Sequence, residues 1–487
     1  MQRGSHTLTD SYARGTMTIL NEPKSGPDRV HPYIPNSVPA VKAEMLRVAG
    51  ARSIEEFFAD IPADLRLSRP LDLPAPFRSE RGLKRHVEGI LARNIPAGDV
   101  LSFLGGGCYQ HHVPAVCDEI NGRSEFLTAY GGEPYDDAGR FQALFEYTSM
   151  MGELLEMDVV SVPTFDGHQA SATAVRMAAR HTKRDVVLVA GNALQDKWSV
   201  MTNYGRADLE FREVRFHPAT GLVDIDHLRA MLDSQVACFY FDNPSCFGTL
   251  QAGEDIAKAV HAVGALLVVG TDPGCLGVIS PPASYGADIV CGDIQTLGMH
   301  MNYGGGQGGF IATHDDEALV MQYPSRLFGI APTRIPGEYG FGDVAFSRTS
   351  FDKRENGNEF VGTAAALWGI TAGVYLALMG PSGMRELGVG IMQRNAYAKQ
   401  RLASIPGVFI PHAGQSHFKE IVVTFDNCGK TVHEINRALR ERGIFGGHDL
   451  SEAFPSLGQS ALYSFTEAHT EADIECLVAA LTEAVKR

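Results

Sequence analysis

Short, continuously apolar segments in the middle of the chain limit what this sequence can fold into. Four of them end at or next to glycine, aspartate or asparagine, and they span residues 185–191, 236–241, 265–270 and 287–291. Between the second and the third, residues 254–263 carry Ile256, Val260 and Val263 at helical spacing. Strands that are apolar throughout and separated by helices are typical of a parallel sheet covered on both faces. The pattern predicts an α/β fold that binds ligands at the carboxyl ends of its strands.

The regions around this predicted sheet have a different character. Residues 1–30 are polar and interrupted by Gly and Pro, which predicts a flexible leader in which Met17 is a candidate for the true start. Residues 31–97 combine helical patterns with Pro-rich interruptions and predict an N-terminal helical arm. We assign residues 98–395 to a large α/β domain and 396–487 to a small C-terminal one. In the small domain, strands are predicted at 418–425 and 461–465, and helices at 432–442 and 470–486.

Charge and hydropathy exclude several classes of protein. The 487 residues include 42 Lys and Arg against 57 Asp and Glu, which gives a formal net charge of −15. An acidic surface repels phosphate backbones, so general nucleic-acid binding is not expected. The sequence has no apolar run of about 18 residues and no basic-then-apolar leader, so we expect neither membrane insertion nor secretion. Eight scattered cysteines without a C-x-x-C pair indicate reduced thiols, and these features together predict a cytoplasmic protein.

A loop with three glycines and two histidines is the first candidate for a pocket. It spans residues 102–114 (SFLGGGCYQHHVP) and contains Tyr109, His111 and His112. Adjacent histidines in an extended segment point in opposite directions and cannot both ligate one metal, so no metal site is predicted. Two interpretations remain open, a polar pocket lining and ordinary hydrogen bonding within a loop.

Two further polar residues lie at the ends of predicted elements. Asp272 comes just after the strand 265–270, where an α/β enzyme can hold a cationic ring nitrogen or a metal, although an Asx turn explains it equally well. His168 lies where a turn leads into a predicted helix at 170–179. Helix N-termini bind anions, and a simple N-cap cluster is the alternative. The glycine run 303–309 is either a tight loop or a phosphate cradle.

Taken together, these features suggest a pyridoxal-phosphate (PLP) fold. A PLP enzyme needs a lysine that holds the cofactor as a Schiff base, some tens of residues after the aspartate. No lysine occurs between Lys258 and Lys353, and Gln295 stands in the segment 292–298 where the lysine is expected. The cofactor fold is therefore predicted without its covalent anchor.

Several longer segments resemble one known family. They are residues 53–62 (SIEEFFADIP), 102–105 (SFLG), 123–130 (RSEFLTAY), 285–292 (YGADIVCG), 375–381 (YLALMGP), 443–447 (GIFGG) and 466–471 (TEAHTE). Together they resemble the α-subunit, or N-terminal half, of the glycine cleavage system P-protein, which is subunit 1 of glycine dehydrogenase (decarboxylating). The similarity runs from about residue 31 to the C-terminus.

The resemblance implies the aspartate aminotransferase fold (fold type I) without its lysine. In that family a homologous, lysine-bearing β-subunit carries PLP and pairs with the α-subunit as αβ or α2β2. The pair decarboxylates glycine, a small amino acid, and transfers the aminomethyl group to the lipoyl arm of H-protein. The α-chain is then not active alone.

The resemblance also suggests which residues of this chain surround the pocket. Tyr109, His111, His112 and Arg348 are its pocket candidates. His168, Asp272 and Gln295 are its cofactor-side residues.

Departures from the family pattern gather in loops and leave alternatives open. Residues 131–140 differ from the family, Asn356 replaces a lysine, and His112 stands where tyrosine is commoner. One alternative is a diverged α-subunit that acts on another amino acid by decarboxylation or Cα–Cβ cleavage, because both reactions use the same electron sink. The other is a non-catalytic scaffolding homologue.

Overall fold

The computed structural model describes residues 30–31, 33–67, 69, 71–127, 138–305, 307–361 and 364–486. Residues 1–29 of the predicted leader and residues 131–137 of the divergent segment 131–140 therefore lie outside the described residues. The chain divides into an N-terminal unit, up to Ala92, and a body, from Arg93 onward. Among the described residues, no helix is both long enough and apolar enough to cross a membrane.

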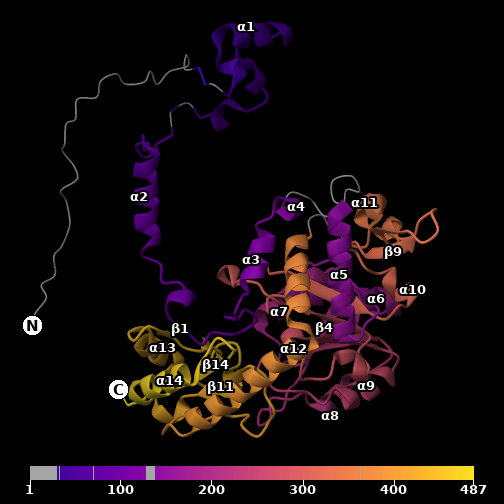
Figure 1. The fold of residues 1–487 in the computed structure, drawn as a ribbon, viewed down its shortest axis with the longest axis vertical. Coiled ribbons are helices and arrows are strands. Elements are labelled where there is room, and N and C mark those ends of the chain that lie inside the picture. Colours follow the sequence, from indigo (N-terminus) through magenta and orange to yellow (C-terminus); the bar gives the residue numbers. More distant parts are fainter. Residues whose placement is uncertain are drawn as a thin grey trace, which may run out of the picture. The chain divides into compact units, whose positions relative to one another are not determined.

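A seven-stranded sheet forms the centre of the body (Figure 1). Its strand order is β2-β8-β7-β6-β5-β3-β4. The strands are β2 (Val159–Val160), β3 (Val186–Ala190), β4 (Glu210–Val214), β5 (Val236–Asp242), β6 (Leu266–Gly270), β7 (Ile289–Asp293) and β8 (Gly309–Thr313). The five strands from β7 to β4 are mutually parallel, whereas β8 runs antiparallel to β7 and to β2. The four strands predicted from continuous apolar segments are confirmed as β3, β5, β6 and β7.

Helices cover both faces of this sheet, which explains why its strands are apolar throughout. On β5, Phe239 and Phe241 face one helical layer, and Cys238 and Tyr240 face the other. The first layer contains α3 (Ala115–Asn121), α5 (Ala138–Leu155), α8 (Ile225–Met231), α9 (Gly253–His261) and α12 (Ala366–Ala403). The second contains α6 (Gly167–Thr182), α7 (Gln195–Gly205) and α10 (Glu317–Val320). The body also includes α4 (Ser124–Leu127), α11 (Ser350–Lys353) and the hairpin β9 (Phe328–Pro332) with β10 (Tyr339–Asp343).

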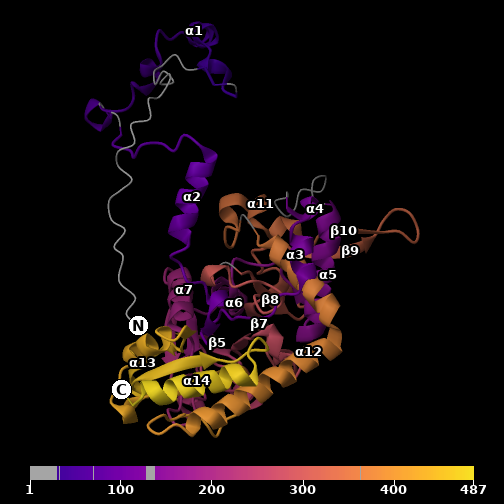
Figure 2. The same cartoon turned by 60° about the vertical axis from the view of Figure 1, so that its left-hand side comes forward.

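The C-terminal part of the body builds a second, smaller core. An antiparallel sheet of order β11-β14-β13 packs against α13 (Val432–Arg440) and α14 (Glu471–Ala484) (Figure 2). Its strands are β11 (Glu420–Thr424), β13 (His448–Asp449) and β14 (Ser460–Ser464). The strands and helices predicted for this region are confirmed.

Two connections join this small core to the large sheet. Strand β1 (Leu101–Ser102) pairs in parallel with β12 (Ile444–Phe445), and the chain then continues through residues 103–114 into α3. Helix α12 contributes residues to both cores and breaks at Gly380, which has φ 56° and precedes Pro381. It also runs through residue 395, so the division of the body at that residue stays a proposal.

The N-terminal unit is built differently. Its helices are α1 (Pro39–Val48) and α2 (Glu80–Leu91), and short 3₁₀ turns such as Ile54–Phe58 lie between them. Neither helix contains a buried residue. Large apolar side chains are therefore exposed along this unit, for example Val48 (72%) and Leu73 (70%).

Candidate functional site

The candidate site is a cavity of ≈ 110 Å³ at the carboxyl ends of β5, β6 and β7. The chain leaves these strands at Asp242, Gly270 and Asp293, which all line the cavity. The start of α6, the start of α7, the loop after β1 and the start of β11 complete the wall. This position is where parallel α/β sheets bind ligands.

Six of the seven predicted site residues lie in or beside this cavity or on its loop, and they fall into three groups. Tyr109, His168, Asp272 and Gln295 line the cavity. His111 lies beside it, hydrogen-bonded to the cavity residue Lys419. The side chain of His112 is exposed to solvent.

Asp272 forms a buried ion pair with Lys419. The Lys419 Nζ atom lies 2.6 Å from Asp272 Oδ2, and only 3% of the lysine side chain is exposed. The other oxygen, Oδ1, accepts hydrogen bonds from the Thr296 hydroxyl at 2.9 Å and from the Gly274 backbone N–H at 2.9 Å. Burial alone would raise the pKa of Asp272, but the ammonium of Lys419 holds it below its usual value. Asp272 is therefore an ionised carboxylate with both oxygens in use.

His111 extends this ion pair to the C-terminal part of the body. Lys419 Nζ donates to His111 Nε2 at 2.9 Å, and His111 Nδ1 donates to Glu467 at 2.8 Å. Because an ammonium can only donate, Nε2 accepts and the imidazole is neutral. Burial and the adjacent ammonium lower the pKa of His111 in agreement with this assignment.

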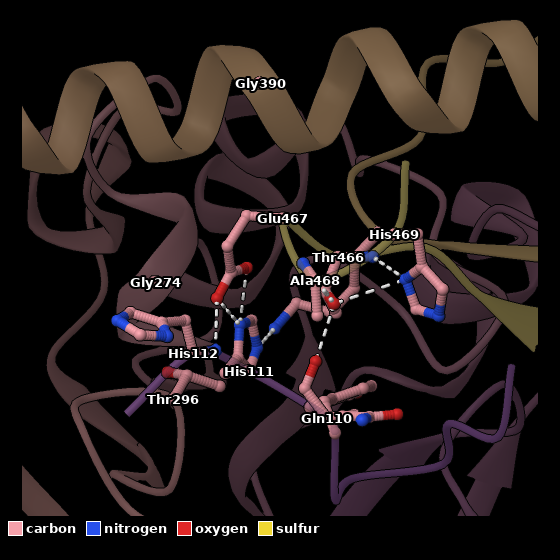
Figure 3. Close-up of polar contacts among 12 residues, drawn as sticks. Gln110, His111, His112, Gly274, Thr296, Gly390, Thr466, Glu467, Ala468 and His469 are labelled. Atoms are coloured by element: carbon pink, nitrogen blue, oxygen red, sulfur yellow. Dashed lines mark hydrogen bonds and ion pairs between the residues drawn. The ribbon is translucent and has the colours of Figure 1, made fainter. Parts of the chain in front are cut away.

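Glu467 holds the loop from the other side. Figure 3 shows its carboxylate facing the His111 ring and the backbone of His112, which donates its N–H to Glu467 at 2.8 Å. Burial opposes ionisation here, but the two hydrogen bonds outweigh it and lower the pKa of Glu467 to about 2. The neighbouring Thr466 hydroxyl donates to the Gln110 carbonyl at 2.6 Å.

The side chain of Gln295 binds the backbone of the same loop. Its Oε1 accepts from the Tyr109 N–H at 3.1 Å, and its Nε2 donates to the carbonyls of Tyr109 at 2.9 Å and Met299 at 3.0 Å. Only 1% of the residue is exposed. At the position where the sequence predicts the lysine of a PLP enzyme, this chain therefore has an amide whose oxygen and nitrogen are both hydrogen-bonded.

Glu420 binds the first part of the loop. It accepts from the Gly106 N–H at 2.7 Å and from the Tyr109 hydroxyl at 3.0 Å. Burial raises the pKa of Glu420 to about 7, although these two donors oppose the shift. The Tyr109 ring also lies under the Lys419 ammonium, 4.0 Å from ring centroid to Nζ.

The N-terminus of α6 is capped by two carboxyl groups. Asp166 Oδ1 accepts from the Gln169 N–H at 2.8 Å, as an N-cap does. Asp293, at the end of β7, accepts from the Gly167 N–H at 2.9 Å and from the Gln295 N–H at 2.8 Å. Burial raises the pKa of Asp293 to about 7. His168 therefore lies in the first turn of a helix whose N-terminus the chain itself caps.

A second lysine also lies in the cavity wall. Lys197, in the first turn of α7, is 2.7 Å from Asp242 Oδ1, which also accepts from the Tyr240 hydroxyl at 2.7 Å. Burial would lower the pKa of Lys197, but Asp242 holds it above its usual value. Both lysines of the cavity are thus paired with carboxylates and charged.

Arg348 lies elsewhere in the body and does not line this cavity. It is 1% exposed, and its Nη1 donates to the carbonyls of Tyr323 at 2.6 Å and Ser325 at 2.5 Å. These contacts hold the chain between α10 and β9. The glycine run 303–309 includes Gly306, which lies outside the described residues, and only Gln307, Gly308 and Gly309 within it are buried.

Sequence reasoning missed the charged partners of the predicted residues. Asp242 and Asp293 are the last residues of apolar strands, and Asp272 comes shortly after the end of another. An aspartate at the end of an apolar segment is visible in the sequence, so this pattern could have identified Asp242 and Asp293 as site residues. Lys419 directly precedes β11, Glu420 is the first residue of that strand, and Glu467 follows β14. Their arrival at the loop depends on how the C-terminal part packs, which no local pattern reveals.

Comparison with known proteins identifies the family. The family model described as glycine cleavage system P-protein matches residues 31–481. A relative from Staphylothermus marinus, named probable glycine dehydrogenase (decarboxylating) subunit 1, is 37% identical over 93% of this chain and 98% of its own. A relative of the same name from Carboxydothermus hydrogenoformans is 37% identical over 92% of this chain and 99% of its own.

Solved structures agree with the fold. A crystal structure of glycine decarboxylase (P-protein) in inhibitor-bound form has a TM-score of 0.82 and 32% identity, and covers 94% of this chain and 100% of its own. A NifS-like protein from Rickettsia africae has a TM-score of 0.58 at 14% identity, over 80% of this chain and 100% of its own. The predicted PLP-type fold, fold type I, is confirmed. The chain belongs to the glycine cleavage system P-protein family, with subunit 1 of glycine dehydrogenase (decarboxylating) as its counterpart.

Proposed function

We propose that this chain is the lysine-less α-subunit of a glycine decarboxylase and works with a homologous β-subunit that carries PLP. The observation that carries the proposal is Gln295, a buried amide with its groups bound to Tyr109 and Met299 where the lysine would stand. PLP supplies an electron sink for the loss of a carboxylate. With the partner, the reaction is the decarboxylation of glycine and the transfer of the aminomethyl group to the lipoyl arm of H-protein.

The residues of this chain's own cavity do not fit PLP. Asp272 would have to face the ring nitrogen, but both of its oxygens are bound to groups of the chain. The N-terminus of α6 would have to face the phosphate, but two of its N–H groups, those of Gly167 and Gln169, already donate to Asp293 and Asp166. We therefore propose that the partner subunit binds the cofactor and that no step of the reaction takes place in this cavity.

The role left for this chain is to support the partner's site. The loop 105–112 exposes the side chain of His112, and histidine can transfer protons near neutral pH. We propose that this loop lies near the partner's cofactor in an αβ or α2β2 assembly. A cytoplasmic location belongs to the same proposal and rests on the cysteine pattern.

Co-expression with the lysine-bearing chain tests the proposal. The pair should exchange labelled bicarbonate with the carboxyl group of glycine, and the exchange should require lipoylated H-protein. Exchange that occurs with another amino acid but not with glycine would favour the diverged α-subunit. The β-chain is first shown to be active with another α-subunit. If it then assembles with this chain but shows no turnover, the result would favour the scaffolding homologue.

Cofactor labelling tests the assignment of PLP. Borohydride reduction of the PLP-loaded complex, followed by peptide mapping, should label one lysine of the partner and none of this chain stoichiometrically. Stoichiometric labelling of Lys197 or Lys419 would contradict the assignment.

A further inference from the structure

The groups that would hold a cofactor in this fold are paired with other groups of the same chain. Three positions matter: the aspartate that faces a ring nitrogen, the helix N-terminus that faces a phosphate, and the lysine. Each has a different occupant here, namely Lys419, Asp293 and Gln295.

The ammonium group of Lys419 makes three contacts at once, whereas the ring nitrogen of a cofactor has a single N–H group to donate. Its Nζ atom lies 2.6 Å from Asp272 Oδ2, 2.9 Å from His111 Nε2 and 4.0 Å from the centroid of the Tyr109 ring. The charge of Asp272 is thus neutralised inside the chain, and the same ammonium reaches two residues of the loop 105–112. Only 3% of the lysine side chain is exposed, so water does not weaken these contacts much.

Asp293 fills the space in front of α6. A Cβ atom on Gly167 would lie 2.8 Å from both the Cβ and the backbone N of Asp293, so the two residues are packed closely. The carboxyl group of Asp293 then joins the helix start at Gly167 to the backbone N–H of Gln295. Gln295 is in turn bound to the backbone of Tyr109.

The loop is held along most of its length by these occupants and their neighbours. Its bonds are Gly106 N–H and Tyr109 O–H to Glu420, Tyr109 N–H and carbonyl to Gln295, Gln110 carbonyl to Thr466, His111 to Lys419 and Glu467, and His112 N–H to Glu467. The side chain of His112 is the polar group that this arrangement leaves exposed at the end of the loop.

We infer that Lys419 and Asp293 replace, from within the chain, the ring nitrogen and the phosphate of a cofactor, so that the cavity serves as a socket for the chain's own loop 105–112. Lys419 is a positioning residue in this socket. It acts on the loop through His111 and Tyr109, and the loop fixes the direction in which His112 projects. The inference goes beyond the proposed function, which can hold even if the socket does not exist.

Hydrogen–deuterium exchange of the full chain in complex with its partner tests the socket. In Lys419→Met, the amides of residues 105–112 should exchange about tenfold faster, as the loss of roughly 1.4 kcal/mol of local stability implies. The matched control is Lys258→Met on α9, whose ammonium is exposed and pairs with the exposed carboxylates of Glu254 and Asp255. The control should leave exchange in the loop unchanged.

A variant that removes both members of the ion pair keeps the test valid if Lys419→Met does not fold. The double variant Asp272→Asn with Lys419→Met leaves no unpaired ion, and it should show the same faster exchange. Unchanged exchange of the loop in the folded variant or variants would overturn the inference.

A spectroscopic readout separates positioning from space filling. We expect the NMR titration of His111 to move to higher pH when Lys419 is replaced by methionine, because Glu467 remains and the ammonium is gone. A side chain that only filled space would leave this titration in place, and that result would overturn the role of Lys419.

A ligand probe tests the exclusion of cofactor. Pyridoxine 5′-phosphate cannot form a Schiff base, so it reports on the non-covalent contacts alone. The complex, with its partner site already filled by PLP, should not bind it saturably. Stoichiometric binding that Asp272→Asn abolishes would overturn the inference.

Discussion

The N-terminal unit and the body place their apolar side chains in opposite environments. In the body, all seven residues of β5 are buried between two layers of helices. In the N-terminal unit, α1 and α2 have no buried residue, and Phe57 and Leu65 are 56% and 72% exposed. Burial of apolar surface is the dominant source of folding free energy. The body therefore has the means to fold alone, whereas the N-terminal unit does not bury its apolar residues within itself and needs a surface outside the unit to cover them.

The largest expected effect comes from a change in the body. Phe239→Ala on β5 removes a ring that is 0% exposed and stacked against Phe241 at 5.8 Å. We expect a loss of about 3–5 kcal/mol in the free energy of unfolding, from lost burial and the cavity left behind. Urea denaturation of the isolated chain measures it. A loss below about 1 kcal/mol would mean that this sheet is not the core we describe.

The second effect separates the two regions by pH. Among its described residues, the N-terminal unit has no buried carboxyl group, whereas the body has Asp293, whose pKa burial raises to about 7. Between the ordinary aspartate pKa and about 7, the folded body holds a proton that the unfolded chain has released, so stability falls as pH rises through this window. Asp293→Asn removes this pH-dependent contribution to the free energy of unfolding.

We therefore expect the stability of Asp293→Asn relative to the unmodified chain to increase by up to about 1.4 kcal/mol per pH unit from roughly pH 4 to 7. Urea denaturation at several pH values measures the difference. Parallel stability curves for the two proteins would show that Asp293 is ionised in the fold throughout this range.

Removal of the N-terminal unit should affect assembly more than folding. The hydrophobic cores of the body are formed by residues from Leu101 onward. Deletion of residues 1–92 should therefore shift the thermal midpoint of the body by only about 1 °C, the equivalent of roughly 1 kcal/mol in a body of this size. Affinity for the partner subunit should fall at least tenfold, as measured by light scattering or titration calorimetry. Loss of the cooperative unfolding transition of the body would show that the body does not fold without the N-terminal unit.

The smallest effect is a substitution in the N-terminal unit. Phe57→Ala matches Phe239→Ala in chemistry but not in environment, so the isolated chain should change in stability by less than about 0.5 kcal/mol. In the presence of the partner, proteolysis near residues 54–58 should be slower for the unmodified chain than for the variant. Equal rates would show that the partner does not cover Phe57.

The sheet could be predicted because its signal is local. Continuous apolar segments mark β3, β5, β6 and β7 wherever they lie in the chain, and the ends of these strands lead directly to Asp272 and Gln295. The loop residues Tyr109 and His111 could be suspected from composition alone. Their partners Lys419 and Glu467 could not, because they lie more than 300 residues further along the chain.

Arg348 illustrates the opposite difficulty. A guanidinium is suited to clamping a carboxylate, but the same donors bind backbone carbonyls well, and in this body they hold Tyr323 and Ser325. The sequence shows that a hydrogen-bond donor is present at Arg348, but it does not show which group accepts its hydrogen bonds. The N-terminal unit is a similar case, since helical spacing predicts its helices but not what they lie against.

The hydrogen bonds of Gln295 make the loss of the lysine difficult to reverse. A Gln295→Lys change would remove the amide that accepts from the Tyr109 N–H, since a lysine only donates. It would also place a third ammonium near a cavity in which Lys197 and Lys419 already occupy Asp242 and Asp272. Return to a cofactor-bearing chain would need several substitutions at once, each unfavourable without the others. If the partner holds PLP as proposed, a lineage with these contacts is committed to a division of labour in which one chain keeps the cofactor and the other keeps its loop.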